Sequence, residues 1–75
     1  MRERRERMRY IVVGTKEKKV TILGMFLHVL YPAMVLFKEH KQAAFYDTLE
    51  IHLWQDGYDL SIVSWINKKE VVNGT

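Results

Sequence analysis

The 75-residue chain has no cysteine, only one proline and only four glycines. The absence of cysteine excludes disulfides and thiolate metal sites. A single domain of this size buries only about 60% of the surface of its unfolded chain, so its stability is marginal. Oligomerisation is then the common remaining source of stability. The hydrophobic content of 48% supplies a core and argues against disorder.

Arginine is absent after residue 9. Residues 1–9 hold five Arg and two Glu, a net charge of +3, whereas residues 10–75 hold seven Lys and seven acidic residues and are neutral. The body of the protein therefore has no general attraction for nucleic acid. We predict a basic flexible tail at 1–8, a single domain at 9–67 and a frayed tail at 68–75.

Targeting and cofactor motifs are also missing. No apolar run follows the charged N-terminus until after Lys19, which argues against a signal peptide and favours a cytoplasmic protein. Glycines are too few for a phosphate-binding or dinucleotide-binding loop. His28, His40 and His52 lie twelve residues apart, without the spacing of a local metal site. We expect no metal and no cofactor.

The strongest local signal is Asp56-Gly57 between two runs of alternating apolar and polar residues. This pattern predicts a two-residue β-hairpin, because both turn positions need a positive φ. Gln55 would pair with Tyr58, and the pairing would continue without interruption to Thr48 and Trp65. One face would carry Leu49, Ile51, Leu53, Leu60, Ile62 and Ile66. The other would carry Thr48, Glu50, His52, Trp54, Asp59, Ser61, Val63 and Trp65.

Residues 20–37 carry no formal charge. A polar line formed by Glu17, Thr21, Gly24 and His28 has helical spacing, and it predicts an amphipathic helix over residues 16–31 that begins at Thr15 and ends before Pro32. A strand that follows a Thr-Lys-Glu-Lys-Lys turn is the competing interpretation, because residues 20–22 are all β-branched.

The predicted fold is a small α+β domain in the order β-α-β-β-β. Its strands would cover residues 9–13, 33–38, 45–54 and 58–66. The first two strands would be parallel neighbours joined by the helix, and the last three would form an antiparallel meander. The single helix would pack on one face of a mostly antiparallel four-stranded sheet, and the hairpin face with the two tryptophans would remain on the other side.

His52 would face Ser61, with Asp59 and Glu50 on the same face. These are the residue types of a hydrolase triad, but a flat sheet offers no oxyanion hole and no pocket that excludes water. Contacts between histidine and serine or carboxylates are ordinary cross-strand pairs. We expect no enzyme activity and no small-molecule substrate.

We expect a protein-interaction or regulatory module that self-associates through the aromatic sheet face or an edge strand. Small size and a lack of motifs are typical of proteins of phages and mobile elements. The alternative is a nucleic-acid-binding protein, and a third hypothesis is a single membrane span at residues 20–37. The predicted protein interface comprises Tyr46, His52, Trp54, Val63 and Trp65. The alternative phosphate contacts are Arg2, Arg4, Arg5, Arg7, Lys16, Lys18 and Lys19.

Overall fold

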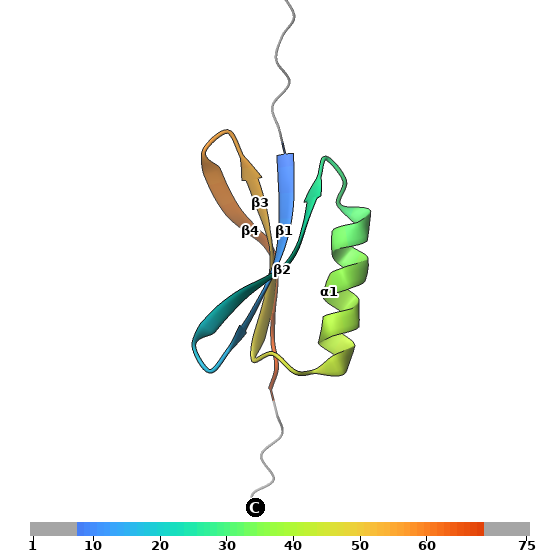
Figure 1. The fold of residues 1–75 in the computed structure, drawn as a ribbon, viewed down its shortest axis with the longest axis vertical. Coiled ribbons are helices and arrows are strands. Elements are labelled where there is room, and N and C mark those ends of the chain that lie inside the picture. Colours follow the sequence, from blue (N-terminus) through green and yellow to red (C-terminus); the bar gives the residue numbers. More distant parts are fainter. Residues whose placement is uncertain (1–7, 69–75) are drawn as a thin grey trace, which may run out of the picture.

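The computed structural model describes residues 8–68. Its elements are β1 (Met8–Lys16), β2 (Lys19–Leu27), α1 (Tyr31–Ala43), β3 (Thr48–Gln55) and β4 (Tyr58–Ile66). The strands form one antiparallel sheet in the order β2-β1-β3-β4, and α1 lies along one face of it (Figure 1). The predicted α+β domain with one helix and four strands is confirmed. The predicted order of elements is wrong, because the structure has β-β-α-β-β.

The predicted helix at residues 16–31 is wrong, and the competing strand interpretation is confirmed. Glu17 and Lys18 have φ angles of 49° and 69° and form a two-residue turn between β1 and β2. Such positive φ angles suit a hairpin turn, because their twist matches that of the flanking strands. The amide N of Glu17 donates a hydrogen bond to Asp47 Oδ2 at 2.8 Å. The turn makes β1 and β2 antiparallel neighbours, and no helical crossover joins them.

The predicted strand at residues 33–38 and the turn after it are also wrong, because this segment forms α1. Pro32 lies in the first turn of the helix, where a missing N–H costs nothing, so it starts a helix and does not end one. Ala33 and Phe37 are four residues apart and both buried. Ala44 closes the helix with a left-handed φ of 56°.

Residues 20–37 are thus divided between a strand and a helix and form no single span. Within residues 8–68, no helix has both the length and the apolar character needed to cross a membrane.

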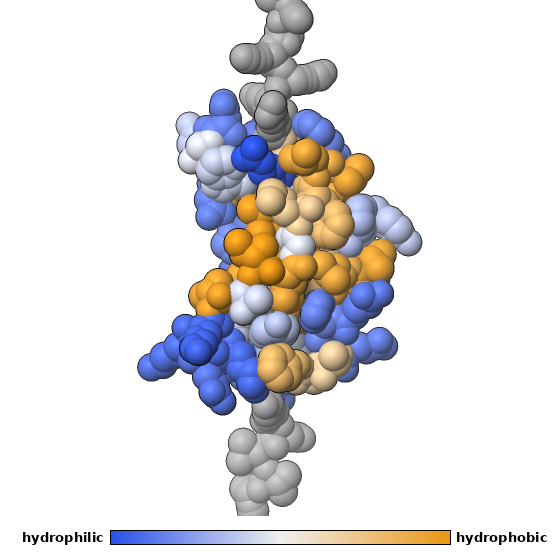
Figure 2. All heavy atoms as spheres, viewed as in Figure 1, coloured by the Kyte–Doolittle hydropathy of each residue, from blue (hydrophilic) through white to orange (hydrophobic). Residues whose placement is uncertain are grey.

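The core lies between α1 and the sheet. Its buried side chains come from α1, β1 and β3, and the helix packs closely on β2 at Gly24, where a Cβ atom would lie 2.7 Å from Leu36 Cδ2. Figure 2 shows hydrophobic residues across the middle of the molecule and hydrophilic residues toward the ends of the two hairpins. The buried core consists of Val12, Ala33, Phe37, Leu49 and Ile51.

The β3–β4 hairpin forms as predicted near its turn but not farther along. Asp56 and Gly57 have φ angles of 52° and 85°, and the predicted pairs from Gln55–Tyr58 to His52–Ser61 are confirmed. A β-bulge then inserts Ile62, so the predicted pairing beyond His52 is wrong by one residue. A one-residue shift moves the following side chains to the opposite face of the sheet. The shifted pairs are Ile51–Val63, Glu50–Ser64, Leu49–Trp65 and Thr48–Ile66.

A second bulge inserts Leu23 into β2, between the pairs Val12–Gly24 and Val13–Ile22. Both bulges therefore lie in the two edge strands of the sheet. Bulges in edge strands disturb the row of free backbone groups through which sheets of different molecules can join. The two edges of the sheet are consequently protected against joining the sheet of another molecule.

The described chain begins and ends close to the predicted domain limits. Met8, predicted to lie in the N-terminal tail, is instead the first residue of β1 and pairs with Gln55. Asn67 is fixed, because its backbone N donates to Asp47 O and its side chain donates to the carbonyl oxygens of Ala44 and Tyr46. The predicted tail contacts of Arg2, Arg4, Arg5 and Arg7 lie outside the described residues.

Candidate functional site: the open face of the sheet

The face of the sheet that points away from α1 is not covered by any element within residues 8–68. Because side chains alternate along a strand, the neighbours of the buried Val12 and Ile51 point to this side. We call it the open face. Its central part is a shallow depression lined by Ile11, Val13, Thr15, Val20, Ile22, Glu50, His52, Trp54 and Asp59.

One half of the open face is apolar. The bulge in β2 keeps four of its hydrophobic residues on this side, although their spacing is not a strict alternation. Ile22 is 65% exposed and Met25 is 55% exposed, values that are high for large hydrophobic side chains in a monomer. We define the apolar patch as Ile11, Val13, Val20, Ile22, Met25, Leu27 and Trp54.

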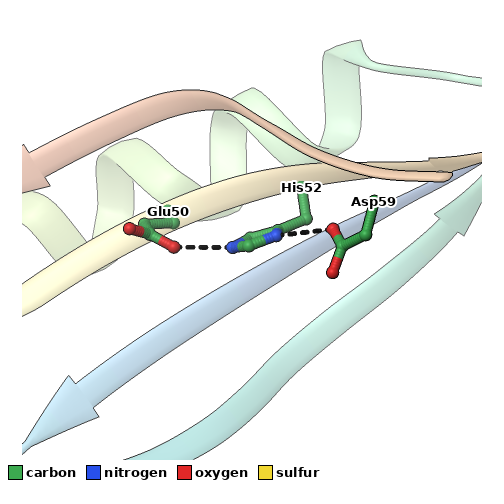
Figure 3. Close-up of polar contacts among 3 residues, drawn as sticks. All are labelled: Glu50, His52 and Asp59. Carbon is green, nitrogen blue, oxygen red and sulfur yellow. Dashed lines mark hydrogen bonds and ion pairs between the residues drawn. The ribbon is translucent and has the colours of Figure 1, made fainter.

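The other half carries a row of three charged or polar side chains, which we call the polar row: Glu50, His52 and Asp59. His52 Nε2 lies 2.6 Å from Glu50 Oε1, and His52 Nδ1 lies 2.8 Å from Asp59 Oδ1. Figure 3 shows the imidazole between the two carboxylates, with the helix behind the sheet. Glu50 and His52 come from alternate positions of β3, and Asp59 is supplied by β4 just after the turn.

Both hydrogen bonds of the polar row can form only when His52 is protonated. A neutral imidazole has one N–H, whereas both ring nitrogens here face carboxylate oxygens that can only accept. Burial alone lowers the pKa of His52, but the hydrogen bonds and negative charges of Asp59 and Glu50 outweigh it and raise the pKa above its ordinary value of 6.5. The His52 side chain is 24% exposed, so its two bonds are partly shielded from water.

Ser61 pairs with His52 across the strands, as predicted. However, both nitrogens of His52 are within hydrogen-bonding distance of carboxylates, so neither is left to accept a proton from the Ser61 hydroxyl. A hydrolase mechanism needs that interaction between base and nucleophile. The contacts of this row are those of two ion pairs, one along β3 with Glu50 and one across the strands with Asp59.

The bulge in β4 separates the residues predicted to form one aromatic surface. Trp54 and His52 lie on the open face, and the guanidinium carbon of Arg9 lies 5.2 Å from the centre of the Trp54 ring. Trp65 and Val63 instead pair with buried Leu49 and Ile51 and pack against the core on the helix side.

Tyr46 also lies on the helix side. Its ring lies directly over Gly14, where a Cβ atom would come within 2.8 Å of it. The ring also makes edge-on contacts with Phe45 and His40. The prediction that Tyr46, Trp54, Val63 and Trp65 share one surface with His52 is therefore wrong.

The predicted lysine cluster lies at the β1–β2 turn. Lys16 Nζ donates to Phe45 O at 3.3 Å and lies 4.6 Å from the centre of the Phe45 ring. Lys18 and Lys19 are exposed. The cluster thus supplies two exposed lysines at one end of the sheet and a third that holds the loop before β3.

Sequence reasoning missed most of the apolar patch, because the pattern of residues 16–31 predicts a helix. The available signal was the alternation of Val20 and Ile22 after a charged turn, which matches Ile11 and Val13 before it. The bulge at Leu23 concealed the continuation of this pattern to Met25.

Within residues 8–68 no group of histidine and acidic side chains has the arrangement of a metal site. No protein-family model, curated protein or solved structure matches this chain.

Proposed function

We propose that this protein is a non-enzymatic interaction module that forms a homodimer by stacking the open faces of two copies. The observation that carries the proposal is the apolar patch, which is exposed on the side of the sheet away from α1. Removing large hydrophobic side chains from water is favourable by roughly 25 cal/mol per Å². Two sheets can stack about 10 Å apart with their side chains interdigitated, as in sandwich proteins.

A second copy suits this surface better than a charged partner. The patch residues of β2 carry no charge, so they offer little to an acidic or basic ligand but match an identical apolar surface. A two-fold dimer joins the same surface on both subunits, which requires the surface to complement itself. The apolar patch fulfils this requirement, with the polar row placed at its border.

The size of the face supports a weak dimer. Four strands about 4.8 Å apart, with eight residues that each rise about 3.3 Å, give a face of roughly 19 by 26 Å. Two such faces would bury about 1,000 Å² in total, near the lower limit for specific interfaces. Interfaces of this size are typical of weak or transient association, so we expect a weak dimer.

The nucleic-acid alternative has less support. Single-stranded nucleic acids stack on sheet aromatics that have basic neighbours. On the open face Trp54 has Arg9 beside it, but Glu50 and Asp59 lie on the same surface. Lys18 and Lys19 are at the turn and outside the depression that contains Trp54.

The test compares two lysine substitutions in edge strands. Ile22→Lys introduces a charge into the apolar patch, whereas Leu60→Lys changes a similarly exposed residue of β4 on the helix side, 56% against 65% exposed. Light scattering after size exclusion, over a concentration series, should show a dimer for the wild type and Leu60→Lys and a monomer for Ile22→Lys. Circular dichroism should show the same fold in all three.

Two results would contradict the proposal. A wild type that is monomeric throughout the concentration series would remove the dimer altogether. A dimer that survives Ile22→Lys but is lost with Leu60→Lys would place the interface on the helix side, where Tyr58 and Leu60 are also exposed.

A further inference from the structure

The polar row borders the apolar patch closely enough to affect association. His52 pairs with Ile11 across β3 and β1, and Ile11 in turn pairs with Met25 across β1 and β2. One line of the sheet therefore runs from the exposed edge of the patch to the polar row. Any subunit that covers the patch comes to lie beside His52.

The net charge of the polar row depends on whether His52 is protonated. With a protonated His52, the polar row has a net charge of −1, and with a neutral His52 the net charge is −2. The neighbouring strands supply few other charges: β1 contributes Arg9, beside Trp54, and β4 contributes Asp59, already in the row. The four patch residues of β2 are uncharged, and His28 follows β2 at the Arg9 end.

Stacking brings two such rows together. When a two-fold axis runs across the strands, each strand of one copy covers the same strand of the other, and the two polar rows face each other. The product of their charges is then four when both histidines are neutral and one when both are protonated. Like charges across an interface oppose association.

We propose that His52 is a pH-sensitive element of the dimer, which makes self-association stronger in weakly acidic than in weakly basic solution. The inference rests on the proposed homodimer and specifies its regulation. Both N–H groups of the imidazolium are bonded to carboxylates of the same copy, so covering the row leaves no donor of His52 without a partner. The raised pKa of His52 places the transition above 6.5.

The effect should be moderate in size. For charges about 10 Å apart near water, the Coulomb energy per unit charge product is small, and salt weakens it further. The change in charge product from one to four therefore corresponds to a dissociation constant that rises on the order of tenfold at low salt. A higher salt concentration should reduce the difference.

The experiment is sedimentation equilibrium of the full chain at about pH 5.5 and about pH 8.5, at low salt. The wild-type dissociation constant should rise on the order of tenfold with pH. His52→Gln should remove the dependence and keep the dimer at the weaker level. His28→Gln is the matched control and should leave the dependence intact.

A second variant tests the same proposal if His52→Gln fails to fold. Glu50→Gln removes one negative charge from the row at either pH and should tighten the dimer in weakly basic solution. Circular dichroism should confirm the fold of each variant.

The outcomes separate the two proposals. A dimer whose dissociation constant does not change with pH, or one in which His28→Gln abolishes the change, overturns the role of His52 and leaves the dimer standing. A monomer at both pH values overturns the proposed function, and the pH effect falls with it.

Discussion

At the residue scale, His52 is the side chain whose chemical state the fold controls most clearly. Its two ring nitrogens contact carboxylates at 2.6 and 2.8 Å, an arrangement that only the imidazolium satisfies fully. The sequence predicted that these residues share a face with Ser61. It could not predict that both nitrogens are occupied, because side-chain orientation depends on contacts that the pattern does not contain.

The stability of the fold should fall as pH rises past the pKa of His52. In the unfolded chain His52 has its ordinary pKa of 6.5, and in the folded protein the pKa is higher. The contribution is fully present below 6.5 and is lost as pH rises through the folded pKa. Urea unfolding of the Ile22→Lys variant, followed by tryptophan fluorescence, measures this without a contribution from dimerisation.

In the same background, His52→Gln should make the free energy of unfolding independent of pH across that interval. A stability that rises with pH in the protein with His52 intact would show that the pKa is lowered by folding, contrary to this prediction.

At the element scale, an element could be predicted where its signal lies in the local sequence, and not where it depends on contacts with other elements. The β3–β4 hairpin was predictable because Asp56-Gly57 supplies the required turn geometry locally. α1 was missed because Pro32 is compatible with both the end and the start of a helix. The bulges at Leu23 and Ile62 were not predictable, since an extra residue in a strand is fixed by pairing with a neighbouring strand, which the local sequence does not contain.

The bulge in β4 gives the two tryptophans different roles, and this can be tested. Trp65→Ala should lower the free energy of unfolding by about 2–4 kcal/mol, because it removes a half-buried ring packed against the core. Trp54→Ala should cost less than about 1 kcal/mol in folding, since its ring is more exposed, but should weaken the dimer.

Urea unfolding and light scattering of the two variants measure the two effects separately. Equal losses of folding stability would mean that the bulge does not divide the tryptophans as the structure shows.

At the scale of the whole molecule, the described residues supply one helix, which covers one of the two sheet faces. The sequence predicted this imbalance correctly, because a four-stranded sheet and a single helix leave one face without a cover. It did not identify which residues occupy that face, since the patch depends on β2, which was interpreted as a helix. Residues 8–68 contain a small core of five buried hydrophobic residues, so association would add stability to a marginal fold.

Thermal stability should therefore increase with protein concentration. A dimer that binds only folded subunits raises the melting temperature by mass action. Scanning calorimetry of the wild type over a hundredfold range of concentration should show a rise of several degrees, whereas Ile22→Lys should melt at one temperature throughout. A wild-type melting temperature that does not change with protein concentration would argue against a dimer of folded subunits.

The described chain enters and leaves the sheet at opposite ends, as Figure 1 shows: Met8 pairs with Gln55 beside one hairpin turn, and β4 ends at Ile66 beside the other. Distances measured between spin labels at these positions would show the direction of the symmetry axis. Because the chain has no cysteine, Met8→Cys or Lys68→Cys would each carry one spin label. An axis across the strands would hold two labels on Met8 far apart and bring a label on Met8 near one on the partner's Lys68. An axis along the strands would reverse both distances.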